Sequence, residues 1–248
     1  MNTFIEENSK TNWKRACHTE LVKYFHFLEE NETSIQFKRV HHYELNEFEI
    51  NRFRAVRNIT KLNISIGLDL DSSTFRAYPI LEVWHDGNDN PSFFPMEGKS
   101  KPSTIPLPVS ELVPGIFKEM VSRNWQRIGM GAINDLFIAE KEPEQGETHI
   151  EMVRVHFFWL EEKMISHINN LMAANSGEDL QAICLYPGVD MNKVNDSKLI
   201  SFTPVLGITH VHEVQSVASV PVRKGGEERL ETYIEYTSPC PNTCKKMD

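Results

Sequence analysis

Two short segments each carry an arginine and a histidine separated by one residue. The first pair is Arg39 and His41, and the second is Arg154 and His156. Both pairs lie in segments that predict β-strands, where side chains two positions apart share one face of a sheet. An arginine can hold a carboxylate or phosphate with two hydrogen bonds, and a nearby histidine can act as a proton donor. These four residues are our candidate ligand-binding site.

A second candidate set gathers histidines and cysteines toward the C-terminus. His210 and His212 share one face of a predicted strand, and Cys240 and Cys244 follow in the segment CPNTC. Two imidazoles and two thiolates would complete a tetrahedral zinc site, although the His-x-His half does not have zinc-finger spacing. Two alternatives stay open: two free thiols on a proline-stiffened tail, or a Cys240–Cys244 disulfide, which a reducing compartment disfavours.

Other residues whose types could take part in a reaction have simpler interpretations. The segment IGLDLDSSTF ends a strand in Asp69 and Asp71, a pattern that resembles phosphoryl-transfer loops. A tight hairpin does not fit those folds, so we predict a turn in which both carboxylates accept backbone hydrogen bonds. Cys17 and Cys184 fall in amphipathic or apolar segments, so we expect buried, inert thiols there.

Hydrophobic periodicity places these residues on helices and strands. Helices are expected at 12–30, at 46–58 with Asn46 as N-cap, at 110–128 with Ser110 as cap, and at 161–174. Strands are expected at 34–43, 62–70, 74–84, 148–160, 180–186, 199–208, 214–223 and 229–237. Five prolines between Pro91 and Pro108 predict an extended connector, because proline offers no amide hydrogen to a sheet.

The chain repeats itself. When Ile35–Ile50 is placed over Ile150–Ile165 without a gap, seven of sixteen positions are identical, including both Arg-x-His pairs. Gly67-Leu68-Asp69 then falls on Gly188-Val189-Asp190, and Pro79-Ile80-Leu81 on Pro204-Val205-Leu206. The identical arginines and histidines have a structural alternative to ligand binding, which is hydrogen bonding across the interface between the two copies.

The repeat predicts an α+β fold with two tandem copies of a helix–strand–helix–strand–strand unit, packed as a pseudo-dimer about an approximate twofold axis. The expected boundaries are 1–95 for the first copy, 96–108 for the connector, and 109–248 for the second copy with a C-terminal hairpin and cysteine tail.

The second copy and its tail, with the segments VRVHFFWLEEKMISHINNLM, LQAICLYPGVD, KLISFTPVLG and YIEYTSPCPNTC, resemble a family of uncharacterised bacterial proteins. The resemblance covers roughly residues 110–248 and is most specific at Pro239–Cys244. It implies a small α+β fold with a terminal Pro-Cys-Pro-x-x-Cys, and it implies no activity.

Composition narrows the classes of partner. The 248 residues carry a formal net charge of −9 and a sequence pI of about 5.6, which disfavours a nucleic-acid partner. The N-terminal residues lack the apolar core of a signal peptide, and no stretch approaches the length of a membrane span, so we expect a cytoplasmic protein without a membrane partner.

These observations predict a non-catalytic binding or interaction protein whose site lies at the pseudo-twofold junction of the two copies. Its partner would be a protein or a small molecule, and the chain would be a monomeric pseudo-dimer or a homo-oligomer. The alternative is a zinc-dependent enzyme, most simply a hydrolase, that uses His210 and His212 as metal ligands with Glu213 or Asp190 as the base. The sequence identifies neither a substrate nor a catalytic residue.

Overall fold

The computed structural model describes residues 3–31, 34–103, 114–141, 151–174, 180–194, 196–212, 228–235 and 238–240. We refer to 3–103 as the N-terminal half and to 114–240 as the C-terminal half. The helices are α1 (Thr3–Arg15), η1 (His18–Glu20), α2 (Leu21–Tyr24), α3 (Glu47–Arg54), α4 (Gly115–Arg127), η2 (Met130–Phe137) and α5 (Glu162–Ala174).

The strands of the N-terminal half are β1 (His26–Asn31), β2 (Ser34–Arg39), β3 (His42–Glu44), β4 (Ile59–Leu68), β5 (Ala77–His85), β6 (Ser92–Pro95) and β7 (Glu97–Lys99). Those of the C-terminal half are β8 (Ile138–Lys141), β9 (Glu151–Arg154), β10 (Phe157–Trp159), β11 (Leu180–Tyr186), β12 (Val205–His212), β13 (Glu228–Glu235) and β14 (Ser238–Cys240). The mixed α+β class is therefore confirmed.

Each half contributes two strands to the main sheet of the other half, β10 and β14 in one case and β3 and β7 in the other. One antiparallel sheet has the order β14-β10-β4-β5-β6, and the other has the order β7-β3-β11-β12-β13. In the first sheet β10 of the C-terminal half pairs with β4, and in the second sheet β3 of the N-terminal half pairs with β11. Two short hairpins, β1–β2 and β8–β9, complete the strands.

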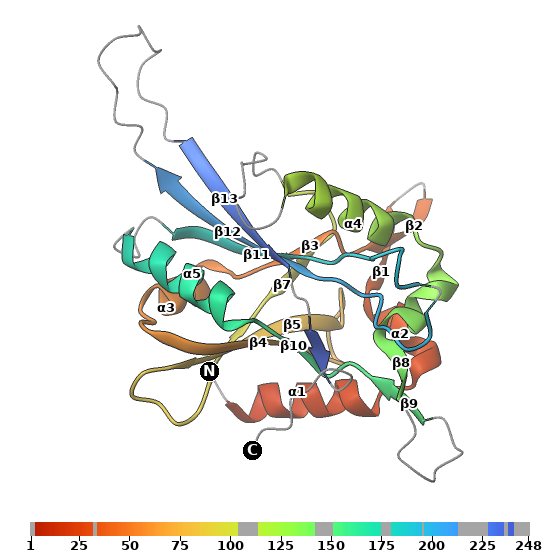
Figure 1. Ribbon diagram of the computed structural model, residues 1–248. Helices are drawn as coiled ribbons and strands as arrows, with labels where there is room; N and C mark the ends of the chain where they lie inside the picture. The colour runs from red at the N-terminus through yellow and green to blue at the C-terminus, as the bar shows by residue number, and fades with distance from the viewer. Residues whose placement is uncertain are drawn as a thin grey trace, which may run out of the picture.

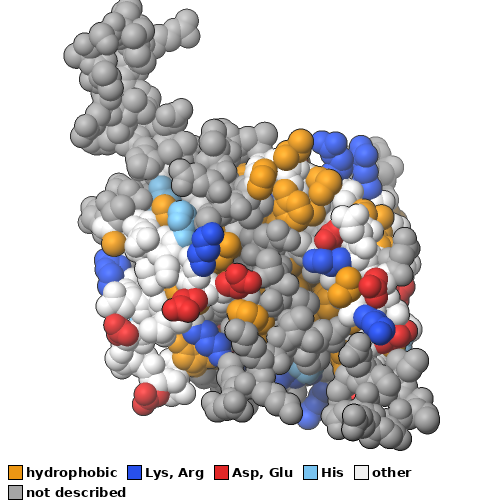
Figure 2. Space-filling model, in the orientation of Figure 1, with side chains coloured by type: hydrophobic (Ala, Val, Ile, Leu, Met, Phe, Trp, Pro, Cys, Tyr) orange, Lys and Arg blue, Asp and Glu red, His pale blue; other side chains and the backbone are white. Residues whose placement is uncertain are grey.

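The two five-stranded sheets pack face to face, and a helix lies on each outer face (Figure 1). Along β4, Leu62, Ile64 and Ile66 are buried in the hydrophobic core, whereas the hydroxyl of Ser65 donates to Glu82, which pairs with Lys10 of α1. The strand is buried on both faces, so its alternation marks two different buried environments. On the drawn face, hydrophobic side chains gather over α4 among mixed charges (Figure 2).

Several expected elements are confirmed, among them β11 and the helix that ends at Ala174. Asn46 caps α3, where its side-chain oxygen accepts a hydrogen bond of 3.0 Å from the backbone N–H of Glu49. The Asp69 carboxylate accepts the backbone N–H of Asp71 at 3.0 Å, as expected for a turn.

The long helix expected over 12–30 is wrong. The helix α1 ends at Arg15, and after the short helices η1 and α2 the chain turns at Phe25 into β1. The backbone from His26 onward forms a ladder with β2 instead of helical hydrogen bonds. The apolar positions that suggested one helical stripe are thus divided between α2 and β1, and Leu28 is exposed.

The expected strands 34–43 and 148–160 are each divided into two. The first breaks at Val40, whose N–H donates to the carbonyl of Phe25, and the second breaks at Val155, whose N–H donates to that of Phe137. At each break the chain leaves a local hairpin and enters the sheet of the opposite half. Periodicity alone does not show such a change of partner.

The described part of the proline-rich region, 91–103, is more ordered than a connector. It contains β6 and also β7, which pairs with β3. The helix α4 has Pro114 at its N-cap, and the expected cap Ser110 lies outside the described residues, as does the expected strand 214–223. The expected strand 199–208 begins later, at Val205. None of the described helices has the length and apolar character needed to cross a membrane.

Candidate functional site

Each arginine of the Arg-x-His pairs contacts the C-terminal end of a helix. Nη1 of Arg39 donates to the carbonyl oxygens of Trp125 and Ile128, and the guanidinium carbon lies 5.7 Å from the centroid of the Trp125 ring. Nη1 of Arg154 donates to the carbonyl oxygen of Trp13 at 2.6 Å, and its guanidinium lies 5.4 Å from the Trp13 ring centroid. Cations are favourable at these helix ends because of the carbonyl groups there. Both arginines therefore have a structural role.

The indoles of Trp13 and Trp125 in turn donate hydrogen bonds to the residues that follow the two arginines. Nε1 of Trp13 donates to the carbonyl of Val155 at 2.9 Å, and Nε1 of Trp125 donates to the carbonyl of Val40 at 2.9 Å. Both indoles pack edge-on against Phe25. These contacts link α1 to the C-terminal half and α4 to the N-terminal half.

The two arginines differ in the hydrogen bonding of their Nε atoms. Nε of Arg39 donates to Nε2 of His26 at 2.9 Å, and Nδ1 of His26 donates to the carbonyl of Val22 at 2.7 Å. Burial lowers the pKa of His26, which favours this neutral imidazole with one acceptor nitrogen. Nε of Arg154 is instead buried without a hydrogen-bond partner among the described residues.

The strand register explains this difference. In the β1–β2 hairpin His26 is opposite Arg39, and in the β8–β9 hairpin Ile138 is opposite Arg154. Isoleucine offers no acceptor, so the Nε donor of Arg154 keeps its hydrogen-bonding capacity.

A cavity of about 360 Å³ adjoins Arg154, between the end of α1, η1 and the β8–β9 hairpin. It is lined by Lys14, His18, Ile138, Glu151, Met152, Val153, Arg154 and His156. Four of these side chains are basic and one is acidic. We call these eight residues the basic cavity.

The electrostatics of the basic cavity favour an anion. The pKa of His156 is lowered by burial and then by the positive charges of Lys14 and Arg154. Burial also lowers the pKa of Arg154, because its guanidinium is partly removed from water. A bound anion would supply the counter-charge and an acceptor for Nε of Arg154. Ile138 and Val153 add an apolar wall.

At the position that corresponds to Lys14, the surroundings of Arg39 have an uncharged residue. Gln126 follows Trp125 as Lys14 follows Trp13, and its amide donates to the carbonyl of Val40 at 2.8 Å. His41 is half-buried, and burial lowers its pKa.

Of the four predicted ligand residues, the lining described for the basic cavity includes Arg154 and His156 but neither Arg39 nor His41. Sequence reasoning missed Lys14 and His18. They precede Arg154 by more than 130 positions, and no spacing in the sequence connects them to it.

The predicted zinc set lies on separate elements. His210 is buried in β12, and the backbone of His212 pairs with that of Glu228 in β13. The backbone of Cys240 pairs with that of Phe157 in the other sheet, and Cys244 lies outside the described residues. The zinc set stays a prediction.

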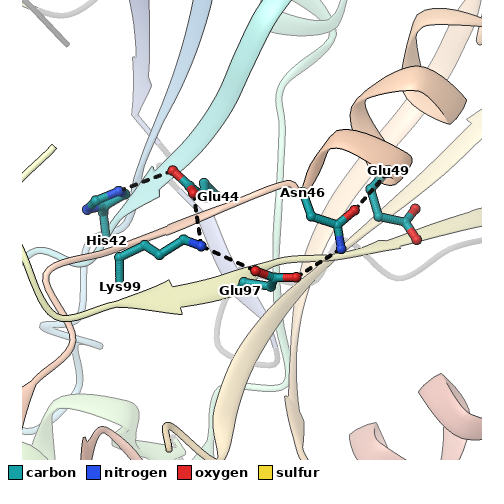
Figure 3. Close-up of polar contacts among 6 residues, drawn as sticks. All are labelled: His42, Glu44, Asn46, Glu49, Glu97 and Lys99. Carbon is teal, nitrogen blue, oxygen red and sulfur yellow. Dashed lines mark hydrogen bonds and ion pairs between the residues drawn. The ribbon is translucent and has the colours of Figure 1, made fainter. Parts of the chain in front are cut away.

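A second polar cluster lies between β3, β7 and α3 (Figure 3). Nε2 of His42 is 3.5 Å from Oε2 of Glu44, and Oε1 of Glu44 is 3.0 Å from Nζ of Lys99. Lys99 also contacts Glu97 at 3.2 Å, and the Asn46 amide donates to the other oxygen of Glu97 at 2.9 Å. Asn46 thus links this cluster to the start of α3.

The cysteines expected to be buried differ in their surroundings. Cys184 is buried on β11, as expected. Its sulfur and one ligand atom each from His42 and Glu44 all lie within 4.8 Å of one another. Cys17 is exposed, which contradicts the expectation. It lies two residues beyond the end of α1, and a hydrogen bond with Thr19 lowers the pKa of its thiol.

Comparison with known proteins adds no relative to this description. No protein-family model, curated protein or solved structure matches the chain.

Proposed function

We propose that this protein is a non-catalytic binding protein for a small anionic ligand, a carboxylate or a phosphate, which it holds in the basic cavity. The observation that carries the proposal is the convergence of four basic side chains on one cavity, among them Arg154, whose buried Nε has no hydrogen-bond partner among the described residues. A buried donor without a partner costs on the order of 1–3 kcal/mol, and an anionic acceptor would remove that cost.

The other lining residues support the same class of ligand. Lys14 and His18 are exposed at the end of α1 and in η1, so they can approach a ligand with little desolvation. Arg154 is held in place by Trp13, which reduces the entropy lost when it binds. A fixed guanidinium with exposed cations beside it suits a carboxylate or phosphate.

We also infer that the chain is an internal duplication packed as a pseudo-dimer, and that the cavity of one copy kept a ligand role. Paired contacts between equivalent positions support the duplication. The amide of Asn12 donates to the carbonyl of Leu68 at 3.4 Å, and that of Asn124 donates to the carbonyl of Val189 at 3.1 Å.

A third pair of contacts supports the same inference. The N–H of Leu45 donates to the carbonyl of Ile183 at 3.0 Å, and that of Leu160 donates to the carbonyl of Leu62 at 3.1 Å. Leu45 and Leu160 are identical positions of the sequence repeat. On this inference, Arg39 is the scaffold counterpart of Arg154, satisfied by His26.

Isothermal titration calorimetry of the full chain tests the proposed function, with inorganic phosphate, sulfate, acetate and succinate as probes. We expect one of these anions to bind with one site per chain. Lys14→Gln and His156→Asn should each weaken binding by roughly tenfold, the effect of losing one charge-assisted hydrogen bond.

The repeat supplies a matched control. His41→Asn changes the counterpart of His156 and should leave the affinity unchanged. Failure of all four anions to bind would overturn the proposal, as would equal weakening by His41→Asn and His156→Asn.

A further inference from the structure

We propose that His42, Glu44 and Cys184 form a binding site for a zinc-type transition metal ion, separate from the basic cavity and with one coordination position left for water. His42 and Glu44 lie on β3, and Cys184 lies on β11. The site therefore joins the N-terminal half to the C-terminal half. It does not depend on the proposed anion-binding function.

Strand register brings the three side chains to one face. Cys184 is directly opposite Glu44 in the β3–β11 pair, and His42 is two residues before Glu44. Because the neighbouring pair, Leu45 and Ile183, is joined by a backbone hydrogen bond, Glu44 and Cys184 form a non-hydrogen-bonded pair. Side chains come closest at such pairs. The three ligand atoms consequently lie within 4.8 Å of one another.

The donor set suits a transition metal. A thiolate, an imidazole nitrogen and a carboxylate oxygen are zinc ligands, whereas magnesium and calcium prefer oxygen alone. Three protein ligands with a fourth, open position are typical of catalytic zinc sites. Metal binding would displace the thiol proton of Cys184 to solvent, so binding releases one proton for each metal ion.

The imidazole of His42 is nearly enclosed by the protein. The residue is only 5% exposed, Nε2 lies 3.5 Å from Oε2 of Glu44, and Nδ1 is buried without a hydrogen-bond partner among the described residues. Burial is also the main cause that lowers the pKa of His42, so its imidazole is in the neutral, metal-binding form at pH 7.

The polar cluster of Figure 3 orients the carboxylate. Lys99 holds Oε1 of Glu44 at 3.0 Å, which leaves Oε2 directed at His42. Glu97 in turn holds Lys99, and the Asn46 amide donates to the other oxygen of Glu97. Partners of this kind fix the direction of a metal ligand and raise metal affinity. The Glu44 and Lys99 side chains are partly exposed, so an ion can reach the buried ligands from solvent along them.

Cobalt titration of tag-free full-length protein tests the site, because a thiolate bound to Co²⁺ gives a charge-transfer band in the near ultraviolet. The main sample is the triple variant Cys17→Ser, Cys240→Ser, Cys244→Ser, which keeps Cys184 as the one thiol. We expect one Co²⁺ per chain with this band, and competition by Zn²⁺.

Two further variants identify the ligands. Cys184→Ser should abolish the charge-transfer band, and His42→Gln, made in the triple variant, should weaken Co²⁺ binding at least tenfold. Circular dichroism verifies that each variant is folded. If His42→Gln does not fold, a second measurement replaces it: whether added Zn²⁺ protects the Cys184 thiol of the triple variant from an alkylating reagent.

Two outcomes overturn the proposal. The first is a folded triple variant that binds no Co²⁺. The second is a band that persists in Cys184→Ser but disappears when Cys240 and Cys244 are changed, which would place the metal on the C-terminal cysteines.

Discussion

His26 accepts a hydrogen bond of 2.9 Å from Nε of Arg39, and at the matching place opposite Arg154 stands Ile138. Nε of Arg39 therefore has an acceptor within the protein, whereas Nε of Arg154 is buried and has none among the described residues. Both arginines hold a helix end, and the proposed function gives Arg154 alone a second role in ligand binding.

Replacing Ile138 with histidine should convert the second arginine to the state of the first. The new imidazole offers an acceptor to Nε of Arg154 and fills part of the basic cavity. We expect anion affinity to fall by roughly tenfold and the free energy of unfolding to rise by about 1 kcal/mol. Calorimetry and urea denaturation measure the two effects. Ile138→Leu, which brings no acceptor, is the control, and unchanged affinity in Ile138→His would contradict the prediction.

Anion binding should strengthen as the pH falls. Burial, Lys14 and Arg154 lower the pKa of His156 in the free protein, so its imidazole is neutral at pH 7. A bound anion favours the charged imidazolium and raises that pKa, so binding takes up a proton. The affinity gain begins when the pH falls through the pKa of the complex and levels off below the pKa of the free protein.

Calorimetry with sulfate from about pH 8 to about pH 5 measures this dependence, because sulfate keeps its charge across the range in which histidine titrates. His156→Asn should flatten the pH profile. A profile that stays equally steep in this variant would assign the proton to another group.

Changing Trp13 or Trp125 to phenylalanine should lower the free energy of unfolding by different amounts. Trp125→Phe leaves the Val40 carbonyl with its hydrogen bond from Gln126, whereas Trp13→Phe removes the donor to the Val155 carbonyl. We expect Trp13→Phe to lower the free energy of unfolding by about 1 kcal/mol more than Trp125→Phe.

Urea denaturation measures this difference. Adding Gln126→Leu to Trp125→Phe should bring its cost to that of Trp13→Phe. If Trp125→Phe alone is the more costly of the two, the role assigned to Gln126 is wrong.

Gly67 and Gly188 align in the sequence repeat. Replacing one or the other with alanine should also lower the free energy of unfolding by different amounts. A Cβ at Gly188 would lie 2.3 Å from the carbonyl oxygen of Thr203, a backbone atom that cannot move alone. A Cβ at Gly67 would approach only side-chain atoms, the nearest at 3.0 Å. Gly188→Ala should cost about 1–3 kcal/mol and Gly67→Ala less, as measured by thermal denaturation. Equal costs would show that the Gly188 backbone adjusts.

The sequence predicted what depends on local pattern. Asn46 is followed by a helical periodicity, and it caps α3. The conserved spacing of Arg39 and Arg154 within the repeat coincides with the paired contacts to Trp125 and Trp13. The cap is a local feature, and the arginine contacts involve the same residue types at the same spacing in both segments of the sequence repeat.

The sequence did not predict what depends on long-range pairing. Alternating apolar residues mark a buried strand without naming its neighbour, so the exchange of β3 and β10 between sheets was not visible. The basic cavity also depends on long-range contacts, so the sequence did not predict it. Lys14 meets Arg154 only because Trp13 docks the end of α1 beside β9. Likewise, Cys184 meets Glu44 through a strand pairing that spans the two halves.

The exchange of β3 and β10 has a consequence for synthesis on the ribosome. When residues 3–103 have emerged, β4 still lacks β10 and β3 still lacks β11, so both offer unpaired edges in a nascent chain. The edge of β4 stays uncovered until β10 (Phe157–Trp159) has been translated, and that of β3 until β11 (Leu180–Tyr186) has been translated. We therefore expect the nascent N-terminal half to be a client of chaperones that shield such edges, and ribosome-release assays on stalled chains of increasing length would show late acquisition of protease resistance.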